Sequence, residues 1–298
     1  MDQVTRHIPV MAKEVQEYLH LPAGGCLVDC TLGMGGHTSL LAAQLGPQGR
    51  IVAIDRDKQS LQQAKENLAA CPTPCEFVHD DFRHVDSILD RLSIQKVDGI
   101  LLDLGLSSFQ LDDVERGFSL RAEGPLDMRM DQESYISAYD LVNSLSEREI
   151  SQILRDYGEE RWHNRIARYM VEQRSRKPIE TTAELSDAVL RAIPRGCAHQ
   201  KIHPATRTFQ AFRIAVNREL ESLEIALDKC LPFLKPRARI CVISFHSLED
   251  RIVKQKFRFY LHRGQLRLVV KKPLRPTENE VGDNPRARSA RLRVAEKI

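Results

Sequence analysis

The chain has 298 residues, of which 42% are hydrophobic and 29% charged, and this ordinary globular composition excludes a disordered or collagen-like protein. The net charge is +3, but residues 254–298 carry 13 Lys and Arg against 4 Asp and Glu, so an acidic body ends in a basic tail. Such a tail either contacts a polyanion from one side or is simply solvated, and charge alone leaves both interpretations open.

Membrane and disulfide-rich classes are also disfavoured. No apolar run approaches the ~18 residues of a membrane span, and the first residues form no basic-then-apolar signal segment. We therefore expect a soluble, cytoplasmic protein that crosses no membrane. The seven cysteines are odd in number and include no C-x-x-C pair, so we expect buried thiols, without a disulfide framework or a metal site.

The first hundred residues alternate between short apolar runs and helical patterns. The runs predict strands at 26–29, 50–55, 76–79 and 97–103, with helices at 36–45, 58–69 and 82–92. This alternation predicts right-handed βαβ units, and hence an α/β fold with a doubly wound, Rossmann-like parallel sheet and helices on both faces.

The pattern changes after the fourth strand. Glycines and a proline make 105–131 a long ordered loop, and the apolar spacing is helical from 138 to about 195. One long helix at 206–231, a fifth strand at 239–244 and two closing strands at 266–271 and 290–295 follow. We expect a core formed by 1–110 and 206–298, with 111–205 as a loop and helical insertion that recognises the substrate.

A glycine-rich turn follows the first strand, at Gly33-Met-Gly35-Gly36-His37. Glycines there allow a sharp turn and a close approach of the backbone to a ligand, and ligands bind at the carboxyl ends of strands in open α/β sheets. The turn alone is also compatible with a dinucleotide site. However, Thr38 stands where the dinucleotide pattern has its third glycine, which disfavours a pyrophosphate contact.

Acidic residues end the next two strands. Asp55 either accepts both ribose hydroxyls of an adenosine or is a turn residue at the end of its strand. Asp80 and Asp81 either meet the adenine or cap the following helix, and Phe82 either contacts the adenine or belongs to the core. Together these positions describe an adenosine pocket without a phosphate clamp. S-adenosylmethionine fits such a pocket, because it carries an amino acid and a sulfonium where NAD carries phosphates.

Asp103 ends the fourth strand, beside the expected position of the transferable methyl group. A conjugated amine needs acceptors for its N–H groups before its lone pair can react, and Asp103 with the carbonyls of Leu104 and Gly105 can supply them. Asp103 can equally bind the amino group of the cofactor. No Cys follows in a Pro-Cys context, so methylation of a ring carbon through a thiol adduct is unsupported.

Longer strings, in order along the chain, resemble those of one family. They occupy residues 7–11, 29–37, 103–112, 116–119, 124–131, 206–220, 244–254 and 284–293. This set is similar to the ribosomal RNA small-subunit (16S) cytosine-N4 methyltransferases, the MraW or RsmH family. Departures are Ala122-Glu123 before a glycine, Phe212 for a common leucine, and Leu104-Gly105-Leu106 where amine methyltransferases carry Pro-Pro and an aromatic.

The resemblance implies a class I methyltransferase core with a helical insertion, and S-adenosylmethionine as cofactor. It implies a cytidine of the decoding region of small-subunit RNA as target, within an assembled or nearly assembled small subunit, and it is compatible with a homodimer. The implied cofactor contacts are Gly35, Gly36, His37, Asp55, Phe82, Asp103 and Gln110.

Several residues are candidates for the substrate side, each with a structural alternative. Phe109 and Phe118 either stack on an unstacked base or are buried, and Arg129 either pairs with a neighbouring Asp, which we favour, or binds phosphate. Arg207 is a candidate RNA contact, whereas we expect Arg213 to pair with Glu219 and His246 to be structural. On a strand, residues two apart share a face, so several of the tail arginines could face one RNA backbone: Arg286, Arg288, Arg291 and Arg293.

Three rival functions remain. One is a DNA or small-molecule amine methyltransferase, although the basic tail argues against a small substrate. Another is a nucleotide-binding oxidoreductase, which Thr38 disfavours. The third is a catalytically silent RNA-binding assembly factor.

Overall fold

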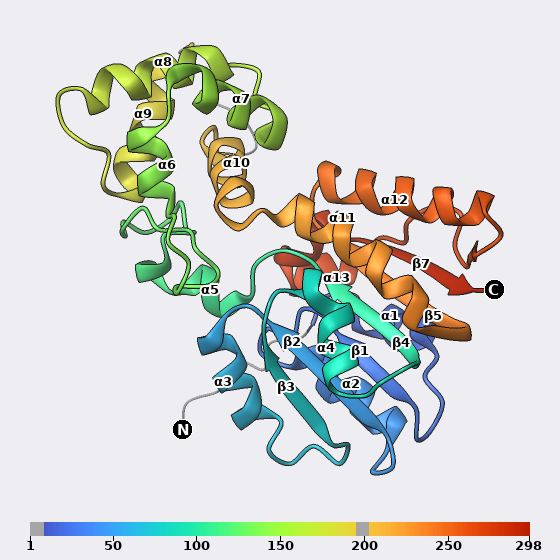
Figure 1. Cartoon of the computed structure of the whole chain (residues 1–298). Helices are drawn as coiled ribbons and strands as arrows, with labels where there is room; N and C mark the ends of the chain where they lie inside the picture. Colours follow the sequence, from blue (N-terminus) through green and yellow to red (C-terminus); the bar gives the residue numbers. More distant parts are fainter. Residues whose placement is uncertain (1–8, 195–202) are drawn as a thin grey trace. The chain divides into compact units, whose positions relative to one another are not determined.

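The computed structural model describes residues 9–194 and 203–298, and Figure 1 draws it. Cys197 and the first two residues of the string at 7–11 therefore lie outside the described residues. The chain forms two compact units, which we call the core unit (Met1–Ser107 with Leu220–Ile298) and the helical unit (Ser108–Glu219). In the described residues no helix has both the length and the apolar character to cross a membrane.

The core unit contains a seven-stranded sheet, counted over the described residues. Strands β1 to β5 are parallel, and β7 is antiparallel to both β5 and β6. The order across the sheet is β3 (Cys75–His79), β2 (Arg50–Asp55), β1 (Cys26–Asp29), β4 (Val97–Asp103), β5 (Leu234–Ser244), β7 (Arg291–Lys297) and β6 (Leu266–Leu268). The strand order reverses between β1 and β4. The carboxyl ends of these two neighbouring strands are therefore the switch point at which open α/β sheets bind ligands.

Helices cover both faces of the sheet, as the alternation of elements predicted. One buried cluster joins the sheet to α4 (Val85–Arg91), α11 (Glu219–Cys230) and α12 (Ser247–His262). The other joins it to α1 (Ala12–Leu19), α2 (Gly36–Leu45) and α3 (Lys58–Asn67). A short helix, α13 (Glu278–Asp283), precedes β7. The doubly wound α/β core is therefore confirmed.

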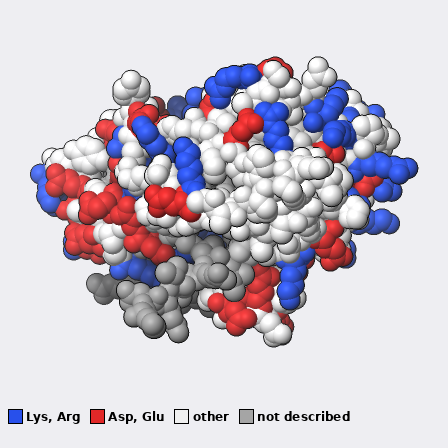
Figure 2. Space-filling model, turned by 90° about the horizontal axis from the view of Figure 1, so that it is seen from below, with Lys and Arg blue, Asp and Glu red and all other residues white. Residues whose placement is uncertain are grey.

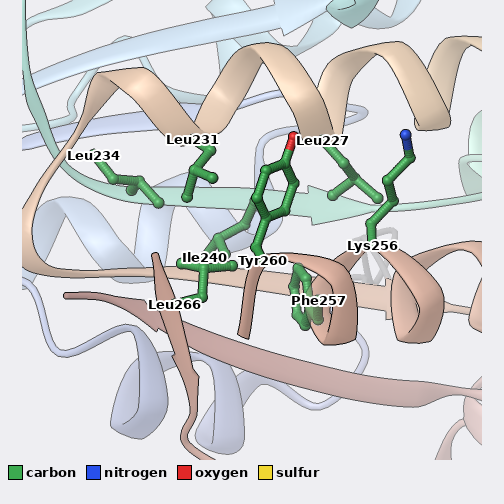
Figure 3. Close-up of a pocket in the computed structure, with 8 residues that line it drawn as sticks. All are labelled: Leu227, Leu231, Leu234, Ile240, Lys256, Phe257, Tyr260 and Leu266. Atoms are coloured by element: carbon green, nitrogen blue, oxygen red, sulfur yellow. The ribbon is translucent and has the colours of Figure 1, made fainter. Parts of the chain in front are cut away.

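Figure 3 shows how closely α11, β5 and α12 pack. Leu227, Ile240 and Phe257 help to line an internal space of about 10 Å³, which holds one water at most. The hydroxyl of Tyr260 at its border donates to Asp228 Oδ1 at 2.8 Å. This part of the core is filled, so the space is no cofactor cleft.

The tail is only partly a strand, so the strand interpretation fails for Arg286 and Arg288 and applies to Arg291 and Arg293 alone. Arg286 and Arg288 lie in a 3₁₀ turn, Pro285–Ser289, because proline starts the turn and the Asn284 side chain accepts from Arg286 N. Arg291 and Arg293 do lie on β7, but both pair with Asp250, at 3.0 and 2.7 Å.

The helical unit is built from α5 (Ser108–Asp112), α6 (Ala138–Ser144), α7 (Glu147–Gly158), α8 (His163–Arg174), α9 (Thr182–Ala192) and α10 (Thr206–Asn217). Capping boxes begin α6, α7 and α9, in which a Ser or Thr and an acid three residues later satisfy each other's backbone N–H groups. Gly158 lets α10 approach α7, because a Cβ there would lie 2.7 Å from the Arg207 carbonyl oxygen. The unit therefore extends beyond the predicted 111–205 and includes α10.

The predicted single helix at 206–231 is two helices. It breaks at Arg218, whose φ of 50° is left-handed, between α10 and α11. Asn217 anchors the break: its side chain donates to the Met128 carbonyl at 2.7 Å and accepts from Met130 N at 2.8 Å. The apolar spacing continues across the break, so it does not reveal the break, whereas these tertiary hydrogen bonds do.

We expect Asn217→Ala to lower the free energy of unfolding by about 2–3 kcal/mol, because it leaves buried backbone groups of the 128–130 segment without partners. Urea denaturation would measure this loss. Gln132→Ala, which removes an exposed amide in the same unit, should change stability by less than about 0.5 kcal/mol. Equal losses in the two variants would contradict the role of Asn217.

Candidate functional site

The loop after β1 is held by a buried carboxylate. Asp29 ends the strand, and its two oxygens accept from Thr31 N at 3.1 Å and from the Thr38 hydroxyl at 2.6 Å. Burial raises the pKa of Asp29 above its usual range. The Asp29 side chain therefore links the end of β1 to the first turn of α2. Sequence reasoning missed it, although Thr38 in place of a glycine was a signal for it.

The glycines of the turn are required by its backbone. Gly33 and Gly35 have φ values of 53° and 82°, a region that side chains disfavour. At Gly35 a Cβ would also lie 2.9 Å from Leu68 Cδ1. Gly36 then opens α2, and His37 follows within its first turn. The turn can therefore bring its backbone close to a ligand at the carboxyl edge of the sheet.

Asp55 connects this turn to β2. Its Oδ2 accepts from Gly33 N at 2.7 Å, and its Oδ1 accepts from Asp57 N at 2.8 Å. Burial raises the pKa of Asp55 to about 6, against the lowering effect of these two hydrogen bonds. The structure thus brings together the predicted glycine turn and the predicted acid of β2.

The acids after β3 have structural partners. Asp81 pairs with Arg56 at 2.6 Å and with Arg83 at 2.8 Å. Burial acts to raise the pKa of Asp81, but the two guanidinium groups outweigh it and hold the pKa below its usual range. Asp80 pairs with His84 at 2.7 Å. Asp81 also caps the 3₁₀ turn Phe82–His84, accepting from Arg83 N at 2.9 Å, and therefore follows the capping alternative. Phe82 is half-buried against the core.

Asp103 at the end of β4 and His37 in the first turn of α2 face each other. The Asp103 N–H donates to the Thr31 hydroxyl oxygen at 2.6 Å, and Asp103 Oδ2 lies 3.5 Å from His37 Nε2. The His37 side chain is 7% exposed and that of Asp103 25%.

Two atoms of this pair lack hydrogen bonds. Asp103 Oδ1 and His37 Nε2 are buried and have no hydrogen-bond partner among the described residues. Buried polar atoms normally have partners, because leaving one unsatisfied costs about 1–3 kcal/mol. The pair can therefore accept and orient a polar ligand group, such as an ammonium or an amine.

Two other predicted contacts belong to the helical unit. Gln110 on α5 is buried, and the adjacent Phe109 is half-buried. Phe118 is buried as well, with Arg116 5.9 Å from the centre of its ring, so the burial alternative applies to it.

The arginines of the helical unit largely follow the structural alternatives. Arg129 pairs with Asp127 at 2.6 Å and donates to the Ser134 carbonyl, which is the internal pair that we favoured. Arg213 pairs with Glu219 at 2.8 Å. Arg207 is exposed and donates to the Glu159 carbonyl at 3.1 Å.

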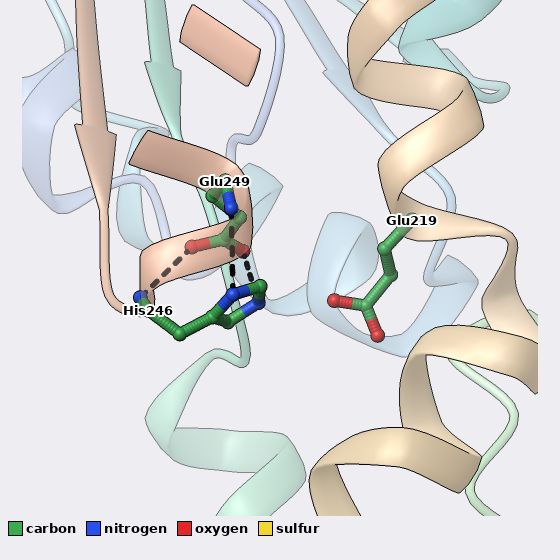
Figure 4. A group of neighbouring side chains, drawn as sticks. All are labelled: Glu219, His246 and Glu249. Carbon is green, nitrogen blue, oxygen red and sulfur yellow. Dashed lines mark hydrogen bonds and ion pairs between the residues drawn. The ribbon is translucent and has the colours of Figure 1, made fainter. Parts of the chain in front are cut away.

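His246 is structural, as expected. Figure 4 shows its ring beside Glu249 at the start of α12. The Glu249 N–H donates to the ring at 3.4 Å, and the Glu249 carboxylate accepts from His246 N at 3.3 Å. These contacts form a capping box that begins α12 at the carboxyl end of β5.

Comparison with known proteins gives a match over nearly the whole chain. The model of the MraW methylase family matches residues 4–298. A protein of Geotalea uraniireducens named Ribosomal RNA small subunit methyltransferase H is 50% identical over 307 residues, with 98% of each chain covered. Proteins of the same name from Halothermothrix orenii and Clostridioides difficile are 46% and 42% identical, again over 98% of this chain and 98% and 99% of theirs.

Solved structures are more distant. A putative rRNA methylase from Clostridium thermocellum has a TM-score of 0.47 and 12% identity, over 96% of this chain and 95% of that one. Likeness at this level says nothing about function.

We expect Asp55 to titrate near pH 6 in the ligand-free chain, because burial disfavours its charged form. Since this pKa exceeds that of the unfolded chain, the folded state binds more protons, and the contribution of Asp55 to stability falls as pH rises from about 4 to about 6. Carbon-13 NMR of labelled aspartates would follow the carboxyl group. Asp81 in the same spectra should titrate below its usual range. A titration midpoint of Asp55 near that of a free aspartate would contradict the expectation for Asp55.

Proposed function

The chain belongs to the MraW methylase family, and from this premise we propose that it methylates small-subunit ribosomal RNA with S-adenosylmethionine as methyl donor. The proposed target is the exocyclic N4 amine of a cytidine in the decoding region, which the string resemblance implies. One structural observation carries the proposal: the unsatisfied atoms of His37 and Asp103 lie beside a glycine turn held by Asp55 at the switch point of the sheet.

The residues present fit S-adenosylmethionine. The Gly33–His37 turn lies between the carboxyl end of β1 and α2, and Asp55 lies where ribose hydroxyls are bound in this architecture. Among the described residues Asp103 Oδ1 has no hydrogen-bond partner, so it can accept from an ammonium or amine. No Lys or Arg lies in the turn, which suits a cofactor without phosphates. Gln110 and Phe82 are proposed as further contacts. When bound, the cofactor supplies an electrophilic methyl group.

Asp103 is the proposed catalytic residue. Its N–H is tied to Thr31, so the carboxylate is held in place at the end of β4. Oδ1 can accept a hydrogen bond from the target amine, which frees the nitrogen lone pair and stabilises the positive charge that develops during transfer. His37 Nε2, 3.5 Å from Oδ2, orients the other oxygen. Most of the rate would come from this positioning.

The helical unit is the proposed substrate-recognition unit, acting on the assembled small subunit in the cytoplasm. Its candidates for RNA contact are the exposed Arg207 and the half-buried Phe109. Arg129 would act indirectly, because its pair with Asp127 orders the loop that precedes α6.

We expect labelled methyl transfer from S-adenosylmethionine to isolated small ribosomal subunits, with N4-methylcytidine as the product in nucleoside analysis. DNA should take up no label, because the relatives carry the name of a ribosomal RNA enzyme. Label in another nucleoside would contradict the N4 assignment alone. The absence of label from all RNA would contradict the proposed function.

We expect Asp103→Asn to reduce kcat by about 10²–10³-fold, because the amide carries no charge to stabilise the transition state. Calorimetry with S-adenosylhomocysteine separates this effect from binding. If Asp103 acts on the target amine, affinity for this product should change little, whereas a parallel loss of affinity would assign Asp103 to the cofactor's amino group. Asp80→Asn is the matched control. Asp80 pairs with His84 and is not part of the His37–Asp103 pair, so this variant should keep full kcat.

A further inference from the structure

Much of the basic charge of the C-terminal part is neutralised within the core unit. Asp250 pairs with Arg291 and Arg293, and Glu296 pairs with Arg239 and Arg267. On the face drawn in Figure 2, acidic and basic side chains both occur, with uncharged areas between them. Any polyanion contact of the core unit must therefore use cations outside these internal pairs.

One face of α12 carries a row of basic side chains. Arg251, Lys254, Arg258 and His262 are spaced by three or four residues and therefore share one side of the helix, and all four are exposed. We call these residues the α12 basic face. Among the residues that the structure describes, none pairs with Lys254 or Arg258. The acids of the helix, Glu249 and Asp250, are buried and already paired.

The opposite side of α12 is committed to the core. Figure 3 shows Lys256, Phe257 and Tyr260 in the space shared with α11 and β5. Lys256 pairs there with Asp228 at 2.8 Å and Glu224 at 3.2 Å. Lys256 is thus paired with acids of α11, whereas the side chains of the α12 basic face are exposed on the other side of the helix.

The α12 basic face begins near the reacting edge, by which we mean the carboxyl end of β4 that carries Asp103. Helix α12 starts directly after β5, whose Ile243 pairs with Asp103 of β4. Arg251 is thus about one turn from that edge, and the face runs away from it for roughly 16 Å, at 1.5 Å per residue. This length spans several nucleotides of a backbone that advances roughly 3.4 Å per nucleotide.

We propose that the α12 basic face binds the phosphodiester backbone of the RNA substrate and leads the strand to the reacting edge of the sheet. The occupant follows from charge complementarity: Lys254 and Arg258 are exposed cations with no ion-pair partner among the described residues, and they match the phosphates of an RNA backbone. The neighbouring Phe259 is 46% exposed, but Arg263 covers its ring at 4.2 Å, which favours a polar partner over a lipid surface. The inference rests on the proposed function, since it assumes an RNA substrate.

The test compares two neutralised double variants of the full chain. Lys254→Gln with Arg258→Gln removes two cations of the α12 basic face. Lys13→Gln with Arg91→Gln removes two exposed cations elsewhere, on α1 across the sheet and at the end of α4, so the net charge of the two variants is equal. All four side chains are exposed, and thermal unfolding would check that both variants fold.

The first measurement is the affinity for a 20-nucleotide single-stranded RNA across a salt series. In the α12 variant the slope of log K against log salt should shrink by about 1.4, because each phosphate contact in a single strand contributes about 0.7. The control variant should keep the wild-type slope. An unchanged slope in the α12 variant, or an equal decrease in both variants, would overturn the inference.

Two further measurements separate the possible failures. With small ribosomal subunits, the α12 variant should show about a tenfold higher KM with kcat nearly unchanged. If the wild type methylates subunits and the α12 variant has the same KM, the inference about α12 fails while the proposed function stands. If the wild type transfers no methyl group to subunits, the proposed function itself fails. Vesicles of anionic phospholipid are the third probe, and a loss of vesicle binding with intact RNA binding would assign the face to a lipid surface and overturn the inference.

Discussion

The hydrogen bond between Gly33 N and the Asp55 carboxylate is the contact on which the site depends. It joins the loop after β1 to the end of β2 and holds the glycine turn in a backbone that only glycines adopt without strain. The Asp29 carboxylate adds a second tie through Thr38. Because α2 begins within this turn, the two carboxylates together determine where His37 lies relative to Asp103.

Asp103 differs from the neighbouring carboxylates in its hydrogen bonding. Asp29, Asp55 and Asp81 all accept hydrogen bonds or form ion pairs within the core unit, whereas Asp103 Oδ1 and the facing His37 Nε2 lack a hydrogen-bond partner among the described residues. A fold that satisfies its neighbouring carboxylates and leaves one buried acceptor without a partner carries a local cost in stability, as functional sites commonly do.

The sequence predicted the core closely for a physical reason. Strands β1, β2 and β4 are buried apolar runs that end in a carboxylate, so both their type and their bounds are visible. The break at Arg218 was missed, because the apolar spacing continues through it and the hydrogen bonds of Asn217 come from residues almost ninety positions away. For the site, the residue types were predictable. Which atoms remain unpaired was not, since pairing such as that of Asp81 with Arg56 and Arg83 exists only in three dimensions.

The insertion of the helical unit between β4 and β5 also affects how the chain is made. These strands pair with Asp103 beside Ile243, yet all of the helical unit separates them along the chain. During translation, at roughly 5–20 residues per second, β4 is an open sheet edge for on the order of ten seconds before β5 is synthesised. The helical unit, whose contacts are local by comparison, can fold during that interval, so chaperone protection would be needed chiefly by the unfinished sheet.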